Sequence, residues 1–313
     1  MTAHEKGGSI SMSQQLTLFP MGTPYTDEEA LDPLVLLRRG ATLVLSVSGG
    51  KDSDAMSHHL LDLRQSEDWP GEVMMVHADL GARVEWRQTP EYVENLARRK
   101  RVPLHIVRWT HGDLIDRIWQ RYYNDPSRPC WPSAQMRYCT SDMKRGPISR
   151  WLRNHFPTGN VICAIGLRAS ESHTRARRPT FTLRTDASAP TKGRFVYDWL
   201  PIHDWQEADV WDCIRQHGGV HHEAYSLGNH RLSCALCVLA SLNDLINGAV
   251  HNPDTYREYC RIEAVTGYSF RQDFWLSDVK PELLPEETLT ALREHKRSKL
   301  GDACAPHQRI DRH

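Results

Sequence analysis

The sequence predicts an α/β fold built on a doubly wound parallel sheet, with a helical extension at its C-terminal end. Short apolar, β-branched runs alternate with segments of helical periodicity through the first half of the chain. This alternation is typical of parallel strands joined by helices. From residue 206 onward the pattern changes to short helices, and the tail beyond Tyr256 is charged and helical.

The elements expected in the sheet follow one another in strand–helix order. The expected strands cover residues 42–47, 73–76, 104–107 and 161–165. The expected helices cover residues 52–65, 89–101, 149–156 and 208–214. In open sheets of this kind ligands bind outside the carboxyl ends of the strands, so the turns that follow the strands are where we expect the site.

Charge and length restrict the class of protein. The 313 residues include 39 Lys and Arg against 39 Asp and Glu, which argues against a free-standing nucleic-acid binder that depends on a large basic field. No apolar run approaches the ~18–20 residues of a membrane-spanning helix, and the N-terminus lacks a signal-peptide pattern. We therefore expect a cytosolic protein without a membrane contact.

Composition divides the chain into three parts. Residues 1–29 are polar and rich in Gly, Ser, Thr and Pro, which predicts a flexible leader. Residues 30–240 form the expected nucleotide-binding domain, and residues 241–313 form a helical region that completes the cysteine site. One apolar peptide, Gln15 to Phe19, interrupts the leader. It is similar to the pentapeptide by which bacterial DNA-associated proteins bind the replication sliding clamp, but such a peptide more often packs its Leu and Phe on its own domain.

The turn after the first strand carries the strongest functional signal. It contains Ser48, Gly49, Gly50, Lys51, Asp52 and Ser53. The glycines let the backbone approach an anion, N–H groups at the helix N-terminus donate to it, and Lys51 adds a positive charge. The spacing is not that of a Walker loop, because Asp52 stands where Ser or Thr would hold magnesium. A different phosphate-binding loop is indicated; the alternative is an ordinary glycine turn capped by Asp52 or Ser53.

Further motifs follow this loop in order. They are Asp79-Leu80-Gly81, Gly166-Leu167-Arg168-Ala169-Ser170-Glu171-Ser172, Arg175, Pro201 to Trp205, Asp209-Val210-Trp211, Tyr225 to Gly228, Arg231 and Cys234-Ala235-Leu236-Cys237. The ordered set resembles the phosphoadenylyl-sulfate reductase-like family of the adenine nucleotide α-hydrolase superfamily, which includes the sulfur-transfer subunits of DNA phosphorothioation systems. The resemblance covers roughly residues 43–237. It implies a Rossmann-like sheet that binds ATP or an adenylyl sulfate.

The resemblance also implies residue roles. Lys51, Asp52 and Arg168 are the expected catalytic residues, and magnesium is an expected helper that Asp52 could contact. The expected nucleotide contacts are Ser48, Gly49, Gly50, Lys51, Asp52, Ser53, Asp79, Gly81, Lys144, Gly166, Arg168, Glu171 and Arg175.

Two groups of basic residues support a phosphate site. Between Arg168 and Arg194, seven Lys and Arg face two Asp and Glu, a concentration that can clamp phosphates. A solvated basic loop is the alternative for the residues from Arg177 onward. The second group, which flanks Cys139, consists of Arg137, Lys144 and Arg145. If both groups converge with Lys51, they could stabilise departing pyrophosphate.

Eight cysteines in a cytosolic chain favour metal binding or redox chemistry over disulfides. The pair Cys234 and Cys237 could be a redox dithiol, half of a zinc or iron–sulfur site, or two core thiols. Cys139 lies in a segment similar to the one that supplies thiolates in cluster-bearing adenylyl-sulfate reductases, with Tyr138 in place of one Cys. A [4Fe–4S] cluster needs a fourth ligand, for which Cys260 is the first candidate and Cys130 the alternative. Cys163 and Cys213 are expected in the core.

The favoured function is an ATP pyrophosphatase that adenylylates an acceptor for sulfur transfer, within DNA phosphorothioation or a close relative. A partner subunit would present the DNA or RNA, and a protein donor would supply cysteine-derived sulfur. The alternatives are reduction of a phosphoadenylyl or adenylyl sulfate, tRNA thiolation, and a non-catalytic nucleotide-sensing subunit. Thiol-dependent reductases carry a Glu-Cys-Gly-x-His element near the C-terminus. The stretch from Ala303 to His307 keeps its Cys and His but lacks the Glu and Gly, which argues against sulfate reduction.

Overall fold

A six-stranded sheet forms the larger end of the molecule, and the strand order is β3-β2-β1-β4-β6-β5. The computed structural model describes residues 32–272 and 274–304. The strands are β1 Thr42–Ser46, β2 Val73–Asp79, β3 Leu104–Arg108, β4 Gly159–Ile165, β5 Phe181–Leu183 and β6 Arg194–Trp199. Five of them are parallel, whereas β5 pairs antiparallel with β6 at the sheet edge. The four predicted strands and the mostly parallel sheet are confirmed; β5 and β6 were not predicted.

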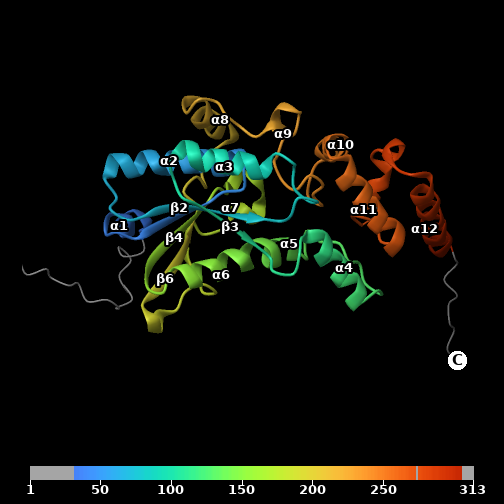
Figure 1. The fold of residues 1–313 in the computed structure, drawn as a ribbon, viewed down its shortest axis with the longest axis horizontal. Helices are drawn as coiled ribbons and strands as arrows, with labels where there is room; N and C mark the ends of the chain where they lie inside the picture. Colours follow the sequence, from blue (N-terminus) through green and yellow to red (C-terminus); the bar gives the residue numbers. More distant parts are fainter. Residues whose placement is uncertain (1–31, 273, 305–313) are drawn as a thin grey trace, which may run out of the picture.

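Helices cover both faces of this sheet (Figure 1). In and around the sheet they are α1 Pro33–Arg38, α2 Lys51–Glu67, α3 Thr89–Lys100, α4 Leu114–Asn124, α5 Tyr138–Thr140, α6 Gly146–His155, α7 His173–Ala176, α8 Glu207–Gln216 and α9 Glu223–Ser226. Leu43 and Leu45 of β1 pack in the cluster that includes α2 and α3, whereas Val44 packs with α6 on the opposite face. Because successive strand residues face opposite sides, this alternation fixes the register of the central strand.

The strand order places a topological switch point beside β1. The chain moves from β1 to β2 on one side and later returns to β4 on the other side. Doubly wound sheets bind ligands at such a point, outside the carboxyl ends of the strands. The turns that follow β1 and β4 meet there, and they carry the phosphate-loop motif and the Gly166–Ser172 motif.

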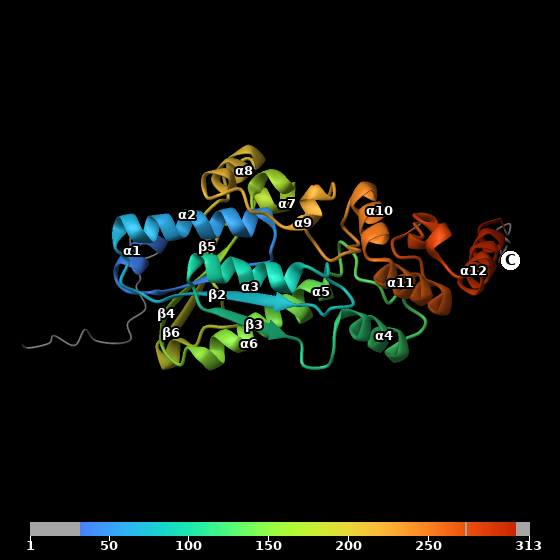
Figure 2. The same ribbon diagram turned by 45° about the horizontal axis from the view of Figure 1, so that its top comes forward.

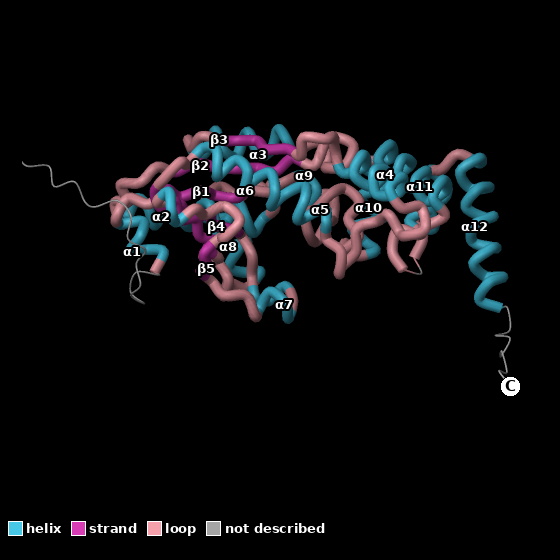
Figure 3. Tube along the Cα trace, turned by 90° about the horizontal axis from the view of Figure 1, so that it is seen from below, coloured by secondary structure: helices cyan, strands magenta, loops and turns pink. Residues whose placement is uncertain are grey.

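The C-terminal region extends away from the sheet, as Figures 2 and 3 show. Its helices are α10 Leu242–His251, α11 Pro253–Thr266 and α12 Glu286–Cys304. Tyr256, Tyr259 and Phe270 are buried in a cluster that also includes α4 residues and the partly buried Cys139 and Cys234. The predicted helical character of this region is therefore present, and its core is continuous with the surroundings of the cysteines.

No helix of the described part of the chain is long and apolar enough to cross a membrane. The predicted leader, residues 1–29, lies outside the described residues, and so does the Gln15–Phe19 peptide.

Candidate functional site

The loop between β1 and α2 holds its shape through its own hydrogen bonds. The hydroxyl of Ser53 accepts from the backbone N–H of Ser48 at 3.1 Å and donates to the carbonyl of Gly50 at 2.9 Å. Gly49 has a φ of +79°, which is unfavourable for residues with a Cβ. Helix α2 begins directly after Gly50, so its first N–H groups face the turn. The predicted strand–turn–helix setting of the phosphate loop is confirmed.

Gly166, which follows β4, packs directly against the start of α2. A Cβ at this position would lie 2.7 Å from the carbonyl of Asp52 and 2.7 Å from the amide nitrogen of Ser53. Because both neighbours are backbone atoms, they cannot move without distorting the loop. The structure thus gives Gly166 a packing role that supports the loop.

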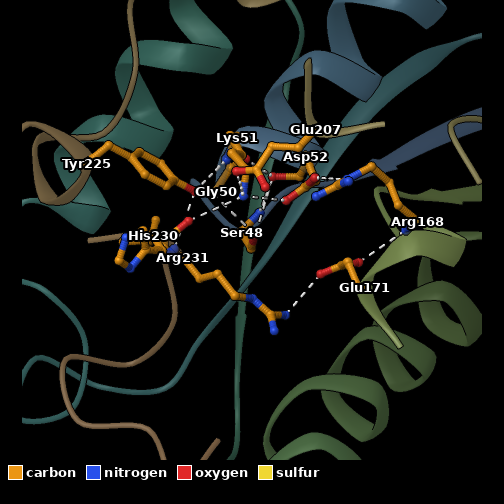
Figure 4. A network of polar contacts seen from close by, with 12 residues as sticks. Ser48, Gly50, Lys51, Asp52, Arg168, Glu171, Glu207, Tyr225, His230 and Arg231 are labelled. Atoms are coloured by element: carbon orange, nitrogen blue, oxygen red, sulfur yellow. Dashed lines mark hydrogen bonds and ion pairs between the residues drawn. The ribbon is translucent and has the colours of Figure 1, made fainter. Parts of the chain in front are cut away.

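Two cations flank Asp52 at the loop (Figure 4). The Nε of Arg168 donates to Asp52 Oδ1 at 2.5 Å, and Arg168 is 4% exposed. The Nζ of Lys51 lies 3.5 Å from Asp52 Oδ2. Its other contacts, with Glu207 Oε1 and the carbonyl of His230, are also 3.5 Å long. These long contacts leave the buried charge of Lys51 weakly neutralised, which is suited to an incoming phosphate.

Glu171 holds two further arginines beside this group. Its carboxylate pairs with Arg175 and accepts from Arg231 at 2.9 Å, and it also accepts from the backbone N–H of Arg168 at 3.1 Å. A cavity of about 330 Å³ opens here. It is lined by Lys51, Arg168, Ser170, Glu171, Gln206, Glu207 and Arg231. The cavity therefore combines three cations with two carboxylates.

A second cavity, of about 390 Å³, runs from the loop to the cysteines. Ser46, Val47 and Ser48 line its nucleotide end, and Cys139, Cys234 and Cys237 line its other end. Arg137 and Lys144 also line it, whereas Lys51 lines the smaller cavity. Arg175 of the 168–194 group lines this cavity together with Arg137 and Lys144, so the two predicted basic groups meet here, but Lys51 does not join them. Glu171 and Arg231 line both cavities, so the cavities adjoin.

The three thiols influence one another electrostatically. Burial is the main cause that raises the pKa of Cys139, and the neighbouring Cys237 raises it further. Lys144 lowers it. Burial likewise raises the pKa of Cys234, with Lys144 again opposing the shift. The segment that carries Cys139 and Lys144 runs through a π-helical turn, Ser141–Arg145, between α5 and α6. Such turns are frequent at functional sites because they re-aim side chains.

Cys260, predicted as the fourth ligand, is not with the other three. It is fully buried on α11 beside Tyr256 and Glu263, and it does not line the cavity. The alternative, Cys130, is also buried apart from the cavity, and burial raises its pKa to about 11. Within residues 32–272 and 274–304, no three Cys, His, Asp or Glu side chains form a metal-ligating group. The structure thus gathers three thiols on one cavity wall and leaves the predicted fourth elsewhere.

The C-terminal region contacts the cysteine turn through other residues. Arg271 donates to the carbonyls of Cys237 and Ala240, at 3.3 and 2.6 Å. The hydroxyl of Tyr259 is buried without a hydrogen-bond partner. Burial raises the pKa of this phenol, and the neighbouring Cys234 and Cys237 raise it further. The region therefore supports the cysteine turn by packing and backbone contacts.

Gly248 of α10 packs directly against the cysteine turn. A Cβ there would lie 2.0 Å from the carbonyl oxygen of Ala235, inside the cysteine turn. Helix propensity alone would make Gly248→Ala stabilising by about 1 kcal/mol. We expect the clash to outweigh this gain and to lower the free energy of unfolding by about 1–3 kcal/mol, measured by urea denaturation. Val250→Ala, at an exposed position of the same helix, is the control. A stabilised Gly248→Ala protein would contradict the packing described here.

Several predicted residues have structural roles instead. Arg184 is buried beside Asp198, and its NH1 lies 3.6 Å from Cys163 Sγ. Arg194 is also buried and donates to three backbone carbonyls. Neither lines a cavity, so the interpretation of the whole 168–194 stretch as a phosphate clamp is wrong at these two positions. Both are inside or beside the unpredicted strands β5 and β6, where a carboxylate holds Arg184 and backbone carbonyls hold Arg194.

Three further groups of residues named in the sequence analysis lie outside the two cavities. Asp79 accepts from the N–H of Gly81 at 2.7 Å and pairs with Arg108, so it shapes the turn after β2. Neither Asp79 nor Gly81 lines a cavity. Arg145 pairs with Asp186 at the surface. Cys163 and Cys213 are buried, as predicted.

Sequence reasoning missed three residues that complete the site. The hydroxyl of Tyr225 accepts from the backbone N–H of Lys51 at 2.9 Å. His77 and Glu85 line the larger cavity, with Nε2 of the histidine 3.7 Å from the carboxylate. His77 directly precedes Ala78 and the Asp79 motif, and its place at a strand end was a usable signal. Tyr225 begins one of the ordered motifs, but its contact with the loop had no sequence signal, because 174 residues separate it from Lys51.

Comparisons with known proteins agree with this arrangement of motifs. A family model described as the phosphoadenosine phosphosulfate reductase domain matches residues 42–240. The adenosine 5'-phosphosulfate reductase of Allochromatium vinosum is 30% identical over 130 residues, which are 42% of this chain and 45% of that protein. The match thus spans less than half the length of this curated relative.

Solved structures with similar folds include two enzymes. The phosphoadenylyl-sulfate reductase of Candida auris, in a phosphate complex, is 20% identical with a TM-score of 0.42, covering 72% of this chain and 98% of that one. The U34-tRNA thiolase NcsA of Methanococcus maripaludis, solved with its [4Fe–4S] cluster, is 13% identical with a TM-score of 0.44, covering 86% and 76%. The family model spans more than half of the chain and contains both the phosphate loop and the cysteine turn, so the chain belongs to the phosphoadenosine phosphosulfate reductase domain family.

Proposed function

We propose that this chain is an ATP pyrophosphatase that adenylylates an acceptor oxygen and so prepares it for replacement by sulfur. One observation carries the proposal: a single cavity connects the phosphate loop, through Ser48, to the thiols of Cys139, Cys234 and Cys237. A nucleotide bound at the loop and a sulfur nucleophile near the thiols would therefore share one enclosed space.

The chemistry explains why these two parts belong together. A phosphate or carbonyl oxygen is a poor leaving group. In the first step the acceptor oxygen attacks the α-phosphorus of ATP, the bond from that phosphorus to the bridging oxygen breaks, and pyrophosphate leaves. In the second step a sulfur nucleophile attacks the acceptor atom, the bond to the activated oxygen breaks, and AMP leaves with that oxygen.

The charged residues have defined parts in the first step. Lys51 and Arg168 line the smaller cavity at the loop, and Arg231 lies between the two cavities. Fixed cations and loop N–H groups stabilise negative charge as it develops on the departing pyrophosphate. Asp52 holds Arg168 in place at 2.5 Å. Magnesium is part of the proposal: Asp52 would be its contact, and the ion would supply positive charge for the phosphates.

An iron–sulfur cluster fits the donor chemistry of the cavity in part. Cys139, Cys234 and Cys237 are soft thiolate donors on one wall, and we propose that they would hold a [4Fe–4S] cluster. When bound, such a cluster supplies iron that can hold a sulfur species or transfer electrons. Zinc and reduced structural thiols are the alternatives. The position of Cys260 argues against its being the fourth ligand.

Single Cys→Ser variants test this ligand set. We expect Cys139→Ser, Cys234→Ser and Cys237→Ser each to lose most of the bound iron and the visible absorption of anaerobically purified protein. Cys260→Ser and the core control Cys163→Ser should retain both, because their thiols are buried away from the cavity. Iron loss in Cys260→Ser but not in Cys139→Ser would contradict the proposed set. Zinc in place of iron in the unaltered protein would contradict the cluster itself.

For the acceptor we propose DNA, presented by a partner subunit, with sulfur arriving from a cysteine-derived protein donor. The motif resemblance to sulfur-transfer subunits of DNA phosphorothioation systems supports this choice, and the neutral charge balance supports a presenting partner. Pyrophosphate release by the full chain should then increase on addition of duplex DNA with its partner proteins. Stimulation by tRNA instead would reassign the acceptor, and tRNA thiolation is the corresponding alternative.

Reduction of an adenylyl sulfate is the second candidate, favoured by the Allochromatium vinosum relative, which is an adenosine 5'-phosphosulfate reductase. It would use the same loop, but two electrons from a dithiol donor would reduce the sulfate sulfur, and sulfite and AMP would be released. Product analysis separates the two candidates, since the first releases pyrophosphate from ATP and the second does not.

A further inference from the structure

Tyr225 joins the phosphate loop to the segment that carries the cysteine pair. Its hydroxyl oxygen accepts from the backbone N–H of Lys51 at 2.9 Å and from that of Leu232 at 3.3 Å. Figure 4 shows this hydroxyl directed at the loop beside Gly50 and Lys51. Leu232 is two residues before Cys234, so one phenol oxygen connects the nucleotide loop with the cysteine turn.

The rest of this connecting segment also lies on the loop. Lys51 Nζ donates to the carbonyl of His230 at 3.5 Å. The side chain of Leu232 packs over Gly49, where a Cβ would lie 3.3 Å from Leu232 Cδ2. Four contacts thus hold residues 225–232 against the site: the phenol oxygen, the His230 carbonyl, the Leu232 side chain and the hydrogen bond from Arg231 to Glu171.

The position of the phenol oxygen suggests what a nucleotide would replace. The N–H of Lys51 is at the first position of α2, a 17-residue helix, where the helix dipole favours negative charge. In a glycine-rich loop, N–H groups at this position donate to phosphate oxygens. In the structure the N–H already donates to the Tyr225 hydroxyl. A phosphate that takes this N–H would compete with the phenol, which also accepts from Leu232.

We infer that Tyr225 is a positioning residue that couples occupancy of the phosphate loop to the position of the cysteine turn. In the structure Tyr225 holds residues 230–234 against the loop. When nucleotide phosphate takes the N–H of Lys51, the phenol leaves, and the segment that ends at Cys234 is released. The cavity thereby changes at its thiol end only after the nucleotide has bound. This inference rests on the proposed function, because it takes the loop to be a nucleotide site.

Amide hydrogen exchange tests this coupling on the full chain, purified anaerobically. The ligand is the α,β-methylene analogue of ATP, and its binding is measured separately by calorimetry. In the unaltered protein, we expect the analogue to speed exchange in peptides that contain Leu232 to Cys237. In Tyr225→Phe, which lacks the hydroxyl, exchange there should already be faster by about fivefold without ligand, the factor that corresponds to a hydrogen bond of about 1 kcal/mol. The analogue should add little further change.

Controls make the outcomes separable. Tyr123→Phe, at a residue 71% exposed, should behave as the unaltered protein. Peptides from β4 report whether Tyr225→Phe is folded. If the analogue binds but leaves residues 232–237 unchanged, or if Tyr225→Phe keeps the full response, the coupling is overturned while the nucleotide site stands. If the analogue does not bind the unaltered protein, the proposed function fails, and this inference fails with it.

Discussion

Replacing Lys51 with alanine is expected to lower kcat/KM for pyrophosphate release from ATP by roughly 10²–10³-fold, the effect of removing one preorganised charge-stabilising group. The Lys51 side chain is 3% exposed, and its three polar contacts are each 3.5 Å long. Its charge is therefore fixed at the cavity wall, with two carboxylates at 3.5 Å. The Tyr225 ring and the His230 carbonyl also contact the ammonium.

Lys192 provides the matched control for the Lys51 variant. Lys192→Ala removes the same charge from the exposed surface of the basic stretch, and it should leave turnover unchanged. Both variants should unfold at similar denaturant concentrations if the loop backbone is intact. Equal turnover of Lys51→Ala and the unaltered protein would mean that phosphate chemistry takes place elsewhere in the chain.

The largest stability effect is expected at Glu263. This carboxylate is fully buried on α11 and accepts from the backbone N–H groups of Phe270, Leu276 and Ser277 at 2.8, 2.8 and 3.0 Å. It thus satisfies three donors of the loop that follows α11. Glu263→Ala leaves them buried without acceptors, at a cost of about 1–3 kcal/mol each. We expect the free energy of unfolding in urea to fall by roughly 3 kcal/mol or more.

Glu282→Ala is the control, because this glutamate is exposed and should change the free energy of unfolding by less than about 0.5 kcal/mol. The pH dependence gives a second readout. Burial raises the pKa of Glu263 to about 7, above the usual 4.5, so the folded state favours the protonated form. The stabilisation is then complete below pH 4.5 and decreases as pH rises through 7. The deficit of Glu263→Ala should be larger at pH 5 than at pH 8; an equal deficit would contradict this account.

Local sequence patterns were sufficient to predict four strands of the sheet and the phosphate loop. The strand β1, the glycine turn and α2 are consecutive in the chain, so their order alone predicts that Lys51 stands at a helix N-terminus. The turn after β4 was predicted as part of the site for the same reason, because ligands bind outside the carboxyl ends of parallel strands. The short edge strand β5 and its partner β6 were not predicted. Arg184 directly follows β5 and Arg194 begins β6, and these arginines made the stretch resemble a basic loop.

Long-range contacts were beyond the reach of sequence patterns. Glu263 has the sequence pattern of an ordinary charged residue on a helix surface, yet it is buried and accepts from three N–H groups that lie 7, 13 and 14 residues further along the chain. Cys260 follows the cysteine pair in sequence but faces Tyr256 in the helical core. The phenol of Tyr225 reaches a loop 174 residues away. Each of these depends on how the C-terminal segments pack, which composition and spacing do not specify.

Product analysis of the anaerobically purified full chain tests the central claim most directly. Pyrophosphate is measured with ATP, and sulfite with adenylyl sulfate and a dithiol electron donor, each with and without DNA and its partner proteins. The proposed function predicts acceptor-dependent pyrophosphate from ATP that Lys51→Ala abolishes, with little sulfite from adenylyl sulfate. Sulfite from adenylyl sulfate without any pyrophosphate from ATP would contradict it and establish the chain as a reductase.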